Sequence, residues 1–405
     1  MRDRYCNTLN QGGSEINTII GIDVSQKSSS FHLLAVGGKG TDGSFPMNHS
    51  GFAALLQKTE GLENPRFVME STGRYHITLA NWLLHHGQSA FIVNPVLVKQ
   101  FSRAHTLRRT KTDTVDARVI AQFAAQDTKA LAHPGREMDD ERLSVARRRE
   151  QIAEDIARAK TQLKADLTVA FPEILELNVF TAGMLDLLVH LSSAQAVWQA
   201  SDTELAGFFT GTRGRSLTFG PERVRGLAVD SIGVASYGPL VSDSAKNLLS
   251  LLARQKLLTQ RLIDLVSRTQ ADDLAIITSI DGIGQVTAAH FLAEIGSIGR
   301  FERYQNLIAF CGTDPGIYQS GNSLVSGRIT KHGNANLRKY VYLMAEGTLL
   351  HNPFFRAYYD KKRTEGFAHR KAMVALMNKL LKTLFALLTK REMFIVPEHS
   401  ISHSL

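Results

Sequence analysis

Thr-Lys-Thr-Asp-Thr-Val-Asp-Ala-Arg-Val-Ile-Ala-Gln-Phe-Ala, residues 110–124, is the stretch from which the architecture of this 405-residue chain can be worked out. Its larger apolar residues recur at helical spacing, which predicts an amphipathic helix with one face in a core; they are Val115, Val119, Ile120 and Phe123. Asp113 and Asp116 are three residues apart and therefore share one side of that helix. Adjacent carboxylates repel each other, so a positive group is expected against them. The simpler explanation is an acidic first turn that favours the helix dipole.

Two further acids lie upstream, each in a short β-rich run. Asp23 is in the run 19–25, and Glu70 ends the run 66–71. An unpaired carboxylate is costly to bury, so a strand has little structural reason to carry one. The whole region predicts three strands, a helix, a strand, a helix, a strand and a helix, the later segments being 51–59, 66–71, 75–86, 89–93 and a helix from Pro95. This alternation indicates an α/β layered domain with a mixed sheet.

The four acids come from three separate elements and could meet at one edge of the sheet. Several hard oxygen ligands suit Mg²⁺ or Mn²⁺, and such ions can assist phosphodiester chemistry. A basic approach able to hold a phosphate backbone lies beside them; it consists of Arg103, Arg108, Arg109 and Lys111. The alternative is a solvated face with capping acids.

From about residue 138 the pattern becomes helical. Leu248, Leu251, Leu258, Leu262 and Leu265 have coiled-coil spacing, and an earlier run from Ile152 to Ala170 repeats it. We interpret both as coiled-coil arms that mediate self-association, with an intramolecular hairpin as the alternative. Between the arms, residues 171–242 contain helical fragments and a Gly/Arg-rich loop.

The C-terminal part offers two candidate phosphate contacts. Gly282 and Gly284 precede a helix and could present backbone N–H groups to a phosphate, although a plain capping turn explains them equally well. Residues 312–338 are interpreted as a loop region in which Ser320 and Gly321 are followed by Arg328, Lys331 and Arg338. A serine hydroxyl attacks phosphorus only when it is positioned and helped to lose its proton. On these residues alone Ser320 competes with Ser323, Ser326 and an ordinary turn.

Composition narrows the class of protein. Lys and Arg total 47 against 38 Asp and Glu, a formal charge of +9 that fits a polyanionic partner. Two cysteines are too few for a disulfide framework or a zinc knuckle. Residues 1–17 are expected to be a loose polar leader and not a signal peptide. The apolar stretch 372–388 is interrupted by Asn378, Lys379 and Lys382 and is therefore predicted to be amphipathic, not a membrane span. We expect a soluble, cytoplasmic, nucleoid-associated protein.

Three blocks of the N-terminal region resemble those of the DEDD insertion-sequence transposases, a family related to the pilin-gene invertases and described as bridge-RNA-guided recombinases. They are Gly21-Ile-Asp23-Val-Ser, Met69-Glu70-Ser-Thr-Gly73 and Lys111-Thr-Asp113-Thr-Val-Asp116-Ala. Ile280-Asp-Gly-Ile-Gly, Ser320-Gly321 and Gly333-Asn-Ala-Asn-Leu-Arg338 resemble the family's C-terminal transposase domain. Asp281 and Thr313 depart from it, standing where Pro and Leu are usual.

The resemblance implies an α/β plus α chain with a RuvC-like, ribonuclease-H-type domain at 18–128. A coiled-coil region at 138–270, with an insert at about 171–242, would follow. A mainly helical transposase domain at 272–350 would carry the serine loop, and a basic helical tail would fill 351–405. Asp23, Glu70, Asp113 and Asp116 would bind Mg²⁺ (or Mn²⁺), and Ser320 would bond covalently to DNA. Donor and target double-stranded DNA would pair with a structured non-coding guide RNA. The active protein would be a homo-oligomer, a dimer or tetramer, with half-sites completed between subunits.

Two other functions are compatible with the same residues. A junction-resolving endonuclease would use the acids to activate water, with Ser320 purely structural. A nucleic-acid-binding protein with decayed chemistry is the third class, but the presence of all four acids and the serine argues against decay. A covalent protein–DNA species separates the recombinase from the nuclease.

Overall fold

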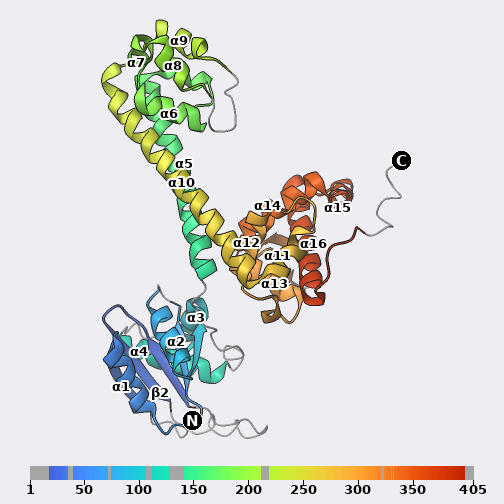
Figure 1. Cartoon of the computed structure of the whole chain (residues 1–405). Coiled ribbons are helices and arrows are strands. Elements are labelled where there is room, and N and C mark those ends of the chain that lie inside the picture. The colour runs from blue at the N-terminus through green and yellow to red at the C-terminus, as the bar shows by residue number, and fades with distance from the viewer. Residues whose placement is uncertain are drawn as a thin grey trace. The chain divides into compact units, whose positions relative to one another are not determined.

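The computed structural model describes residues 18–34, 40–71, 74–105, 112–127, 141–210, 219–320, 323–329, 331 and 333–396, with the backbone alone for 315–320 and 323–328. The chain divides into two compact units, Met1–Asp140 and Glu141–Leu405 (Figure 1). Taken together they form a mixed α/β protein that is mostly helical, with a small N-terminal sheet.

The N-terminal unit is built on a five-stranded sheet of order β3-β2-β1-β4-β5. β1 is antiparallel to β2 and parallel to β4, so the predicted mixed sheet is confirmed. The elements follow the predicted order: β1 Ile19–Asp23, β2 Ser28–Leu34, β3 Thr41–Pro46, α1 His49–Thr59, β4 Arg66–Glu70, α2 Tyr75–His85, β5 Ser89–Val93, α3 Pro95–His105 and α4 Asp113–Gln126.

Both faces of this sheet are covered by helices. The first four residues of β1 are all buried, as expected for a strand without a solvent face. One apolar cluster joins strand residues such as Phe67 to Phe52 of α1 and Leu79 of α2. The other joins Val68 to α3 and α4. Alternate residues of β4 therefore point into two separate cores.

Gly21 is the point at which α4 lies on the sheet. A Cβ atom there would be 2.3 Å from the carbonyl oxygen of Ala117 and 2.4 Å from the backbone nitrogen of Ala121. The helix backbone thus rests directly on β1, and only glycine permits this approach. The first turn of α4, which begins at Asp113, is placed by that contact.

The second unit begins with two long helices, α5 Glu141–Ala170 and α10 Gly238–Thr269, which we call the helical arm (Figure 1). They pack antiparallel within one chain, because Arg142 donates to Thr269 (3.2 Å) at one end and Ser244 donates to Asp166 (2.5 Å) near the other. Leu251 and Leu262 are buried in the chain's own clusters. The structure therefore contains the intramolecular hairpin, and self-association through this seam stays a prediction.

Residues 171–210 and 219–242, where the sequence predicts helical fragments, form a helical cluster at one end of the helical arm, and the predicted Gly/Arg-rich loop lies outside the described residues. Its elements are η2 Pro172–Glu176, α6 Ala182–His190, α7 Ala194–Gln199, α8 Asp202–Gly207, α9 Pro221–Val229 and η3 Ala235–Tyr237. They share an apolar core with the arm helices.

The rest of the unit is a second helical core at the opposite end of the helical arm. Its elements are α11 Ala271–Thr278, α12 Gln285–Ile295, η4 Ile298–Arg300, α13 Tyr304–Cys311, α14 Ala335–His351, α15 Pro353–Thr364 and α16 His369–Lys390. Of the helices described, α16 alone is long and apolar enough to cross a membrane. Its apolar face is buried in this core, including Leu376, Leu380 and Leu384. It is therefore a core helix, in line with the predicted amphipathic segment.

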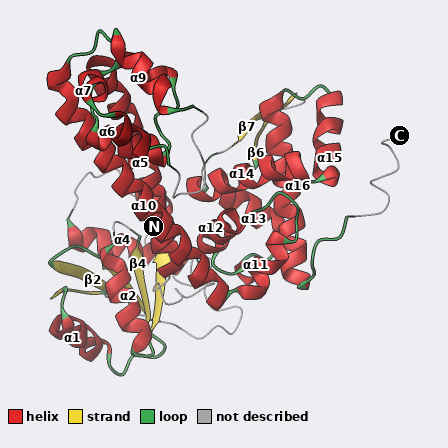
Figure 2. Ribbon diagram, turned by 45° about the horizontal axis from the view of Figure 1, so that its top comes forward, coloured by secondary structure: helices red, strands yellow, loops and turns green. Residues whose placement is uncertain are grey.

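The predicted loop region at 312–338 is wrong in one respect, because it contains a β-hairpin (Figure 2). β6 Pro315–Ser320 pairs antiparallel with β7 Ser323–Ile329, and Ser320 is opposite Ser323. The sequence did carry a signal, since Gly321-Asn322 is a dipeptide typical of a two-residue hairpin connection. The many Gly and Ser residues around it obscured the strands.

Candidate catalytic site

Asp23 and Glu70 lie at the carboxyl ends of neighbouring parallel strands. β1 and β4 pair with Ile22 opposite Met69, so Asp23 and Glu70 are the next residues along in the same register. Neighbouring strands are about 4.8 Å apart. Both acids are only partly buried. The two carboxylates therefore lie at the same edge of the sheet, which is where ligands bind in open α/β sheets.

Asp113 and Asp116 occupy the first turn of α4. Thr112 caps this helix, its hydroxyl accepting from the Val115 N–H at 3.3 Å. Acids in a first turn also interact favourably with the helix dipole, so part of their presence has a structural reason. Asp113 is exposed and Asp116 is half-buried. The contact of α4 with Gly21 fixes the helix that carries this pair on the face of the sheet, directly over β1.

A charged cluster that the sequence did not reveal holds α4 against the sheet. Arg118, two residues after Asp116, donates to Asp42 of β3 at 2.7 Å. His32 of β2 contacts the other oxygen of Asp42 at 2.6 Å. The hydrogen bond from His32 and the Arg118 guanidinium hold the pKa of Asp42 below its ordinary value. These contacts hold β2, β3 and α4 together close to Asp116. Asp42 and Arg118 are 76 positions apart in the sequence.

We expect Asp42→Asn to destabilise the N-terminal unit more at pH 6 than at pH 3. A carboxylate with a lowered pKa in the folded state stabilises the fold above its unfolded pKa, and that contribution is lost as the pH falls through the folded value. Asp42 is more than a third exposed, so the effect should be that of a surface ion pair, about 0.2–1 kcal/mol. Thermal unfolding at both pH values measures it.

The matched control is Asp155→Asn, which removes an exposed partner of Arg158 in the helical arm. That variant should leave the melting of the N-terminal unit unchanged at either pH. Equal destabilisation by Asp42→Asn at pH 6 and pH 3 would contradict a role for the Asp42 charge.

The donor chemistry at the sheet edge fits a hard divalent cation. Carboxylate oxygens are the ligands that Mg²⁺ and Mn²⁺ prefer, with water completing the coordination. In the parts of the chain that the structure describes, no group of three or more His, Cys, Asp or Glu side chains is gathered closely enough to hold a metal. Asp23 and Glu70 thus lie at one edge of the sheet, and the described acids do not form a closed ligand set.

The predicted basic contacts have different environments. Arg103 is exposed near the end of α3, whereas Arg108, Arg109 and Lys111 lie outside the described residues. Lys331 is exposed, and Arg328 lies in β7. Arg338 donates to the carbonyl oxygen of Cys311 at 3.0 Å, which gives it a structural contact that the sequence did not predict.

The serine hairpin, residues 315–329, is clamped where it leaves the helical core. The chain enters and leaves through Gly312 and Gly333, and a Cβ at Gly333 would be 2.4 Å from the Gly312 nitrogen. Asn334 donates its N–H to the Phe310 carbonyl oxygen at 2.7 Å, which closes the base. Thr313 donates to Asn378 of α16 at 2.6 Å. Ser320 is therefore at the far end of a hairpin whose foot is fixed by backbone and side-chain contacts.

Gly282 has a packing role that its sequence context did not reveal. Its φ is +93°, and a Cβ there would be 2.2 Å from the Gly347 carbonyl oxygen. The glycine thus lets the turn before α12 approach the backbone of α14. Gly284, by contrast, has open space where a side chain would be, at the N-cap of α12. Gly282 is thus explained by its positive φ and its packing and Gly284 is the N-cap residue, while the phosphate contact stays a prediction for both.

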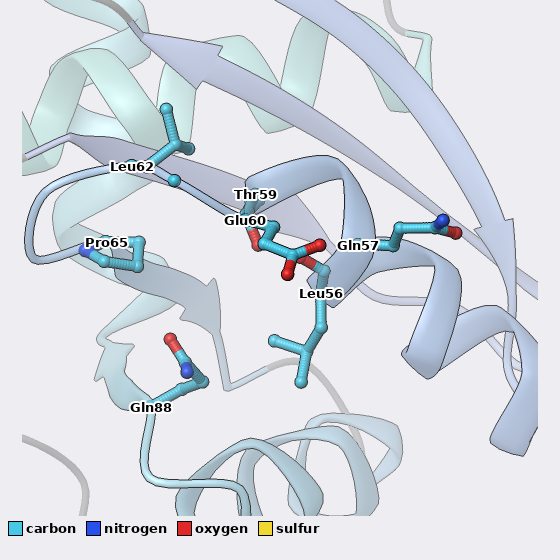
Figure 3. A pocket seen from close by; sticks show the side chains of 8 residues that line it. Leu56, Gln57, Thr59, Glu60, Leu62, Pro65 and Gln88 are labelled. Atoms are coloured by element: carbon cyan, nitrogen blue, oxygen red, sulfur yellow. The ribbon is translucent and has the colours of Figure 1, made fainter.

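A pocket in the N-terminal unit lies away from the acids (Figure 3). Its lining includes Glu60 at the end of α1, together with Pro65 and Gln88. The last two residues immediately precede β4 and β5. The pocket is thus at the amino ends of the parallel strands, whereas Asp23 and Glu70 are at the carboxyl ends.

Comparison with known proteins gives matches at both ends of the chain. A DEDD transposase family model of the IS110 type matches residues 20–172, and the model described as "Transposase IS116/IS110/IS902 family" matches residues 274–360. The 44.8 kDa protein of insertion element IS116 from Streptomyces clavuligerus is 28% identical over 84% of this chain and 86% of its own length. The pilin gene-inverting protein of Moraxella bovis is 21% identical over 93% and 97%. The transposase of element IS1111A from Coxiella burnetii is 34% identical over 30% and 35%.

Proposed function

Because the chain belongs to the IS116/IS110/IS902 family of insertion-sequence transposases, we propose that it is a site-specific DNA recombinase that cuts and rejoins DNA through Ser320. Transposition or inversion of DNA is the activity named for its relatives. The observation that carries the proposal is that Asp23 and Glu70 lie at the same edge of the sheet. The strand that carries Asp23 also contacts α4 directly.

Asp23, Glu70, Asp113 and Asp116 would hold the divalent cation that the DEDD domain suggests, with Mg²⁺ or Mn²⁺ as the ion. When bound, such an ion polarises a phosphodiester and stabilises charge on the attacking and leaving oxygens. Carboxylates brought together around such an ion would otherwise repel one another, so bound cation and acids would stabilise each other. The sheet order of the unit supports the RuvC-like, ribonuclease-H-type assignment.

Ser320 would supply the oxygen that attacks phosphorus. A bond from its Oγ to phosphorus forms as the phosphorus bond to one sugar oxygen breaks; the Oγ proton leaves and the sugar oxygen takes one up. The resulting phosphoserine ester is close in energy to the phosphodiester, so the reverse step on a new DNA end rejoins the strand without an external energy source. Arg328 and Lys331 would hold the phosphate. The clamped foot of the serine hairpin would limit the positions that Ser320 samples.

A structured guide RNA would choose donor and target, with base pairing reading sequence and the protein reading backbone and helix shape. Gly282 and Gly284, with Arg103, Arg108, Arg109, Lys111 and Arg338, would supply further backbone contacts. Two or four copies would be needed to process both DNA duplexes. Action on DNA, together with the packing of the long apolar helix α16 into the helical core, fits a cytoplasmic location.

The proposal is tested with the purified chain, RNA transcribed from the element's non-coding ends, and supercoiled plasmids that carry donor and target. Strand exchange is expected with Mg²⁺ or Mn²⁺ and RNA, and none in EDTA. Full exchange in EDTA would contradict the role of a metal ion, and full exchange after RNase treatment would contradict the role of a guide RNA. DNA cutting without any covalent protein–DNA species would favour the water-using nuclease.

A further inference from the structure

The solvent side of α16 carries a row of lysines. Lys371, Lys379 and Lys382 recur at spacings of eight and three, which places them on one side of the helix. The opposite side is buried in the helical core. With Lys362 of the neighbouring α15, we call these four residues the lysine track.

Each amine of the lysine track lies over an aromatic ring. Lys371 and Lys362 are 4.2 and 5.3 Å from the ring centre of Phe367. Lys379 is 5.1 Å from that of Phe354, and Lys382 is 5.2 Å from that of Tyr304. Such contacts are attractive and restrict side chains that are otherwise flexible. The cations are thus held in place before any partner binds.

The charge of the lysine track is only partly neutralised. Lys362 pairs with Glu365 at 2.6 Å. Over the described ranges of the chain, Lys371, Lys379 and Lys382 have no carboxylate within ion-pair distance. Held cations without counter-charges create a positive potential that favours a polyanion, and a nucleic-acid strand releases bound counterions when it binds them.

The lysine track passes the foot of the serine hairpin. Asn378 precedes Lys379 and both accepts from the Thr313 hydroxyl at 2.6 Å and donates to the Thr313 carbonyl at 3.2 Å. Thr313 lies two residues before the start of β6. Tyr304, under Lys382, belongs to α13, whose end leads into the same foot. The helix α16 therefore carries lysines of the track and also the asparagine that contacts the foot of the serine hairpin.

We propose that the lysine track binds the phosphate backbone of the nucleic-acid strand that is delivered to Ser320. Delivery of that strand to Ser320 rests on the proposed function, whereas phosphate binding by the lysine track does not. The aromatic faces are already occupied by lysines, so the contact is to phosphate and not by base stacking. It is consequently independent of sequence and positions the strand without selecting it.

The test is the salt dependence of binding for Lys379→Gln/Lys382→Gln in the full chain. Three probes are used: a 30-base-pair DNA duplex of mixed sequence, the same sequence as a DNA single strand, and an RNA stem-loop. Loss of two phosphate contacts should reduce the slope of log K against log salt by about 1.8 on the duplex or about 1.4 on the single strand. Lys379→Arg/Lys382→Arg should restore it.

The matched control is Lys160→Gln/Lys164→Gln in the helical arm. Each of those lysines also lies over an aromatic ring, in both cases that of Phe180, at 5.1 and 5.5 Å, so this variant likewise removes two charges and their ring contacts. This control should bind as wild type does. A reduced slope on a DNA probe supports the proposal, whereas a reduced slope on RNA alone would contradict it, because the strand delivered to Ser320 is DNA.

Unchanged slopes on all three probes, in a variant that melts like wild type, would overturn the proposal. If the Gln variant has a reduced slope but the wild-type protein never exchanges strands, phosphate binding by the lysine track is supported and the proposed recombinase function is contradicted.

Discussion

Ser320→Ala is expected to lose strand exchange by about 10⁴-fold or more while RNA and DNA binding persist. Alanine has no oxygen to bond to phosphorus, yet it leaves the backbone pairing of Ser320 with Ser323 intact. The measurement is a protein–DNA adduct that survives SDS, mapped by mass spectrometry after nuclease digestion. Wild type should give it at Ser320, and the variant should give none.

Ser323→Ala and Ser326→Ala are the matched controls, because both residues lie in β7 of the same hairpin. They should retain the adduct and most of the exchange activity. Should Ser320→Ala still cut DNA at the wild-type rate, the attacking oxygen belongs to water and the nuclease interpretation is correct.

Asp23→Asn and Glu70→Gln should each reduce exchange by at least about a hundredfold, and the double variant should be inactive. Either change removes one carboxylate charge at the shared strand end while conserving size. Addition of Mg²⁺ should raise the melting temperature of wild type and raise that of the double variant less, since a cation stabilises the fold only where it binds. Asp113→Asn and Asp116→Asn are expected to have the same effects as Asp23→Asn on exchange and on the response to Mg²⁺.

Glu63→Gln is a suitable control, because Glu63 is an exposed acid in the turn before β4, at the other end of the strand that carries Glu70. It should affect neither activity nor the response to Mg²⁺. Equal stabilisation by Mg²⁺ in wild type and in Asp23→Asn/Glu70→Gln would show that these acids do not hold the ion.

Local patterns predicted the N-terminal unit well and the contacts between its parts poorly. The apolar runs around Asp23 and Glu70 identified the strands, because a buried strand needs continuous apolar residues. The sequence shows Gly21 only as part of a motif, and its contact with Ala117 is visible only in three dimensions. The same holds for Asp42 and Arg118, which no spacing rule relates.

In the C-terminal unit the long helices were evident from leucine spacing, but their partner was not. An apolar stripe serves equally well against a helix of the same chain or of another, and here Leu262 is used within the chain. The β-hairpin was missed because its strands are short and rich in glycine and serine. Asn378, the residue that links the hairpin to the lysine track, looked like a mere interruption of an apolar helix.

The helical arm has a consequence for how the chain acquires its structure. Its two helices are separated by roughly seventy residues, and closing a loop of that length has an entropic cost that grows with the logarithm of its length. The elements between residues 171 and 242 share one apolar core with the adjoining ends of both helices, and Gly233 packs against Ala170 at the junction. Formation of that core brings the ends of α5 and α10 together. The arm can then assemble turn by turn from Asp166 and Ser244 toward Arg142 and Gln270, with each step a local event.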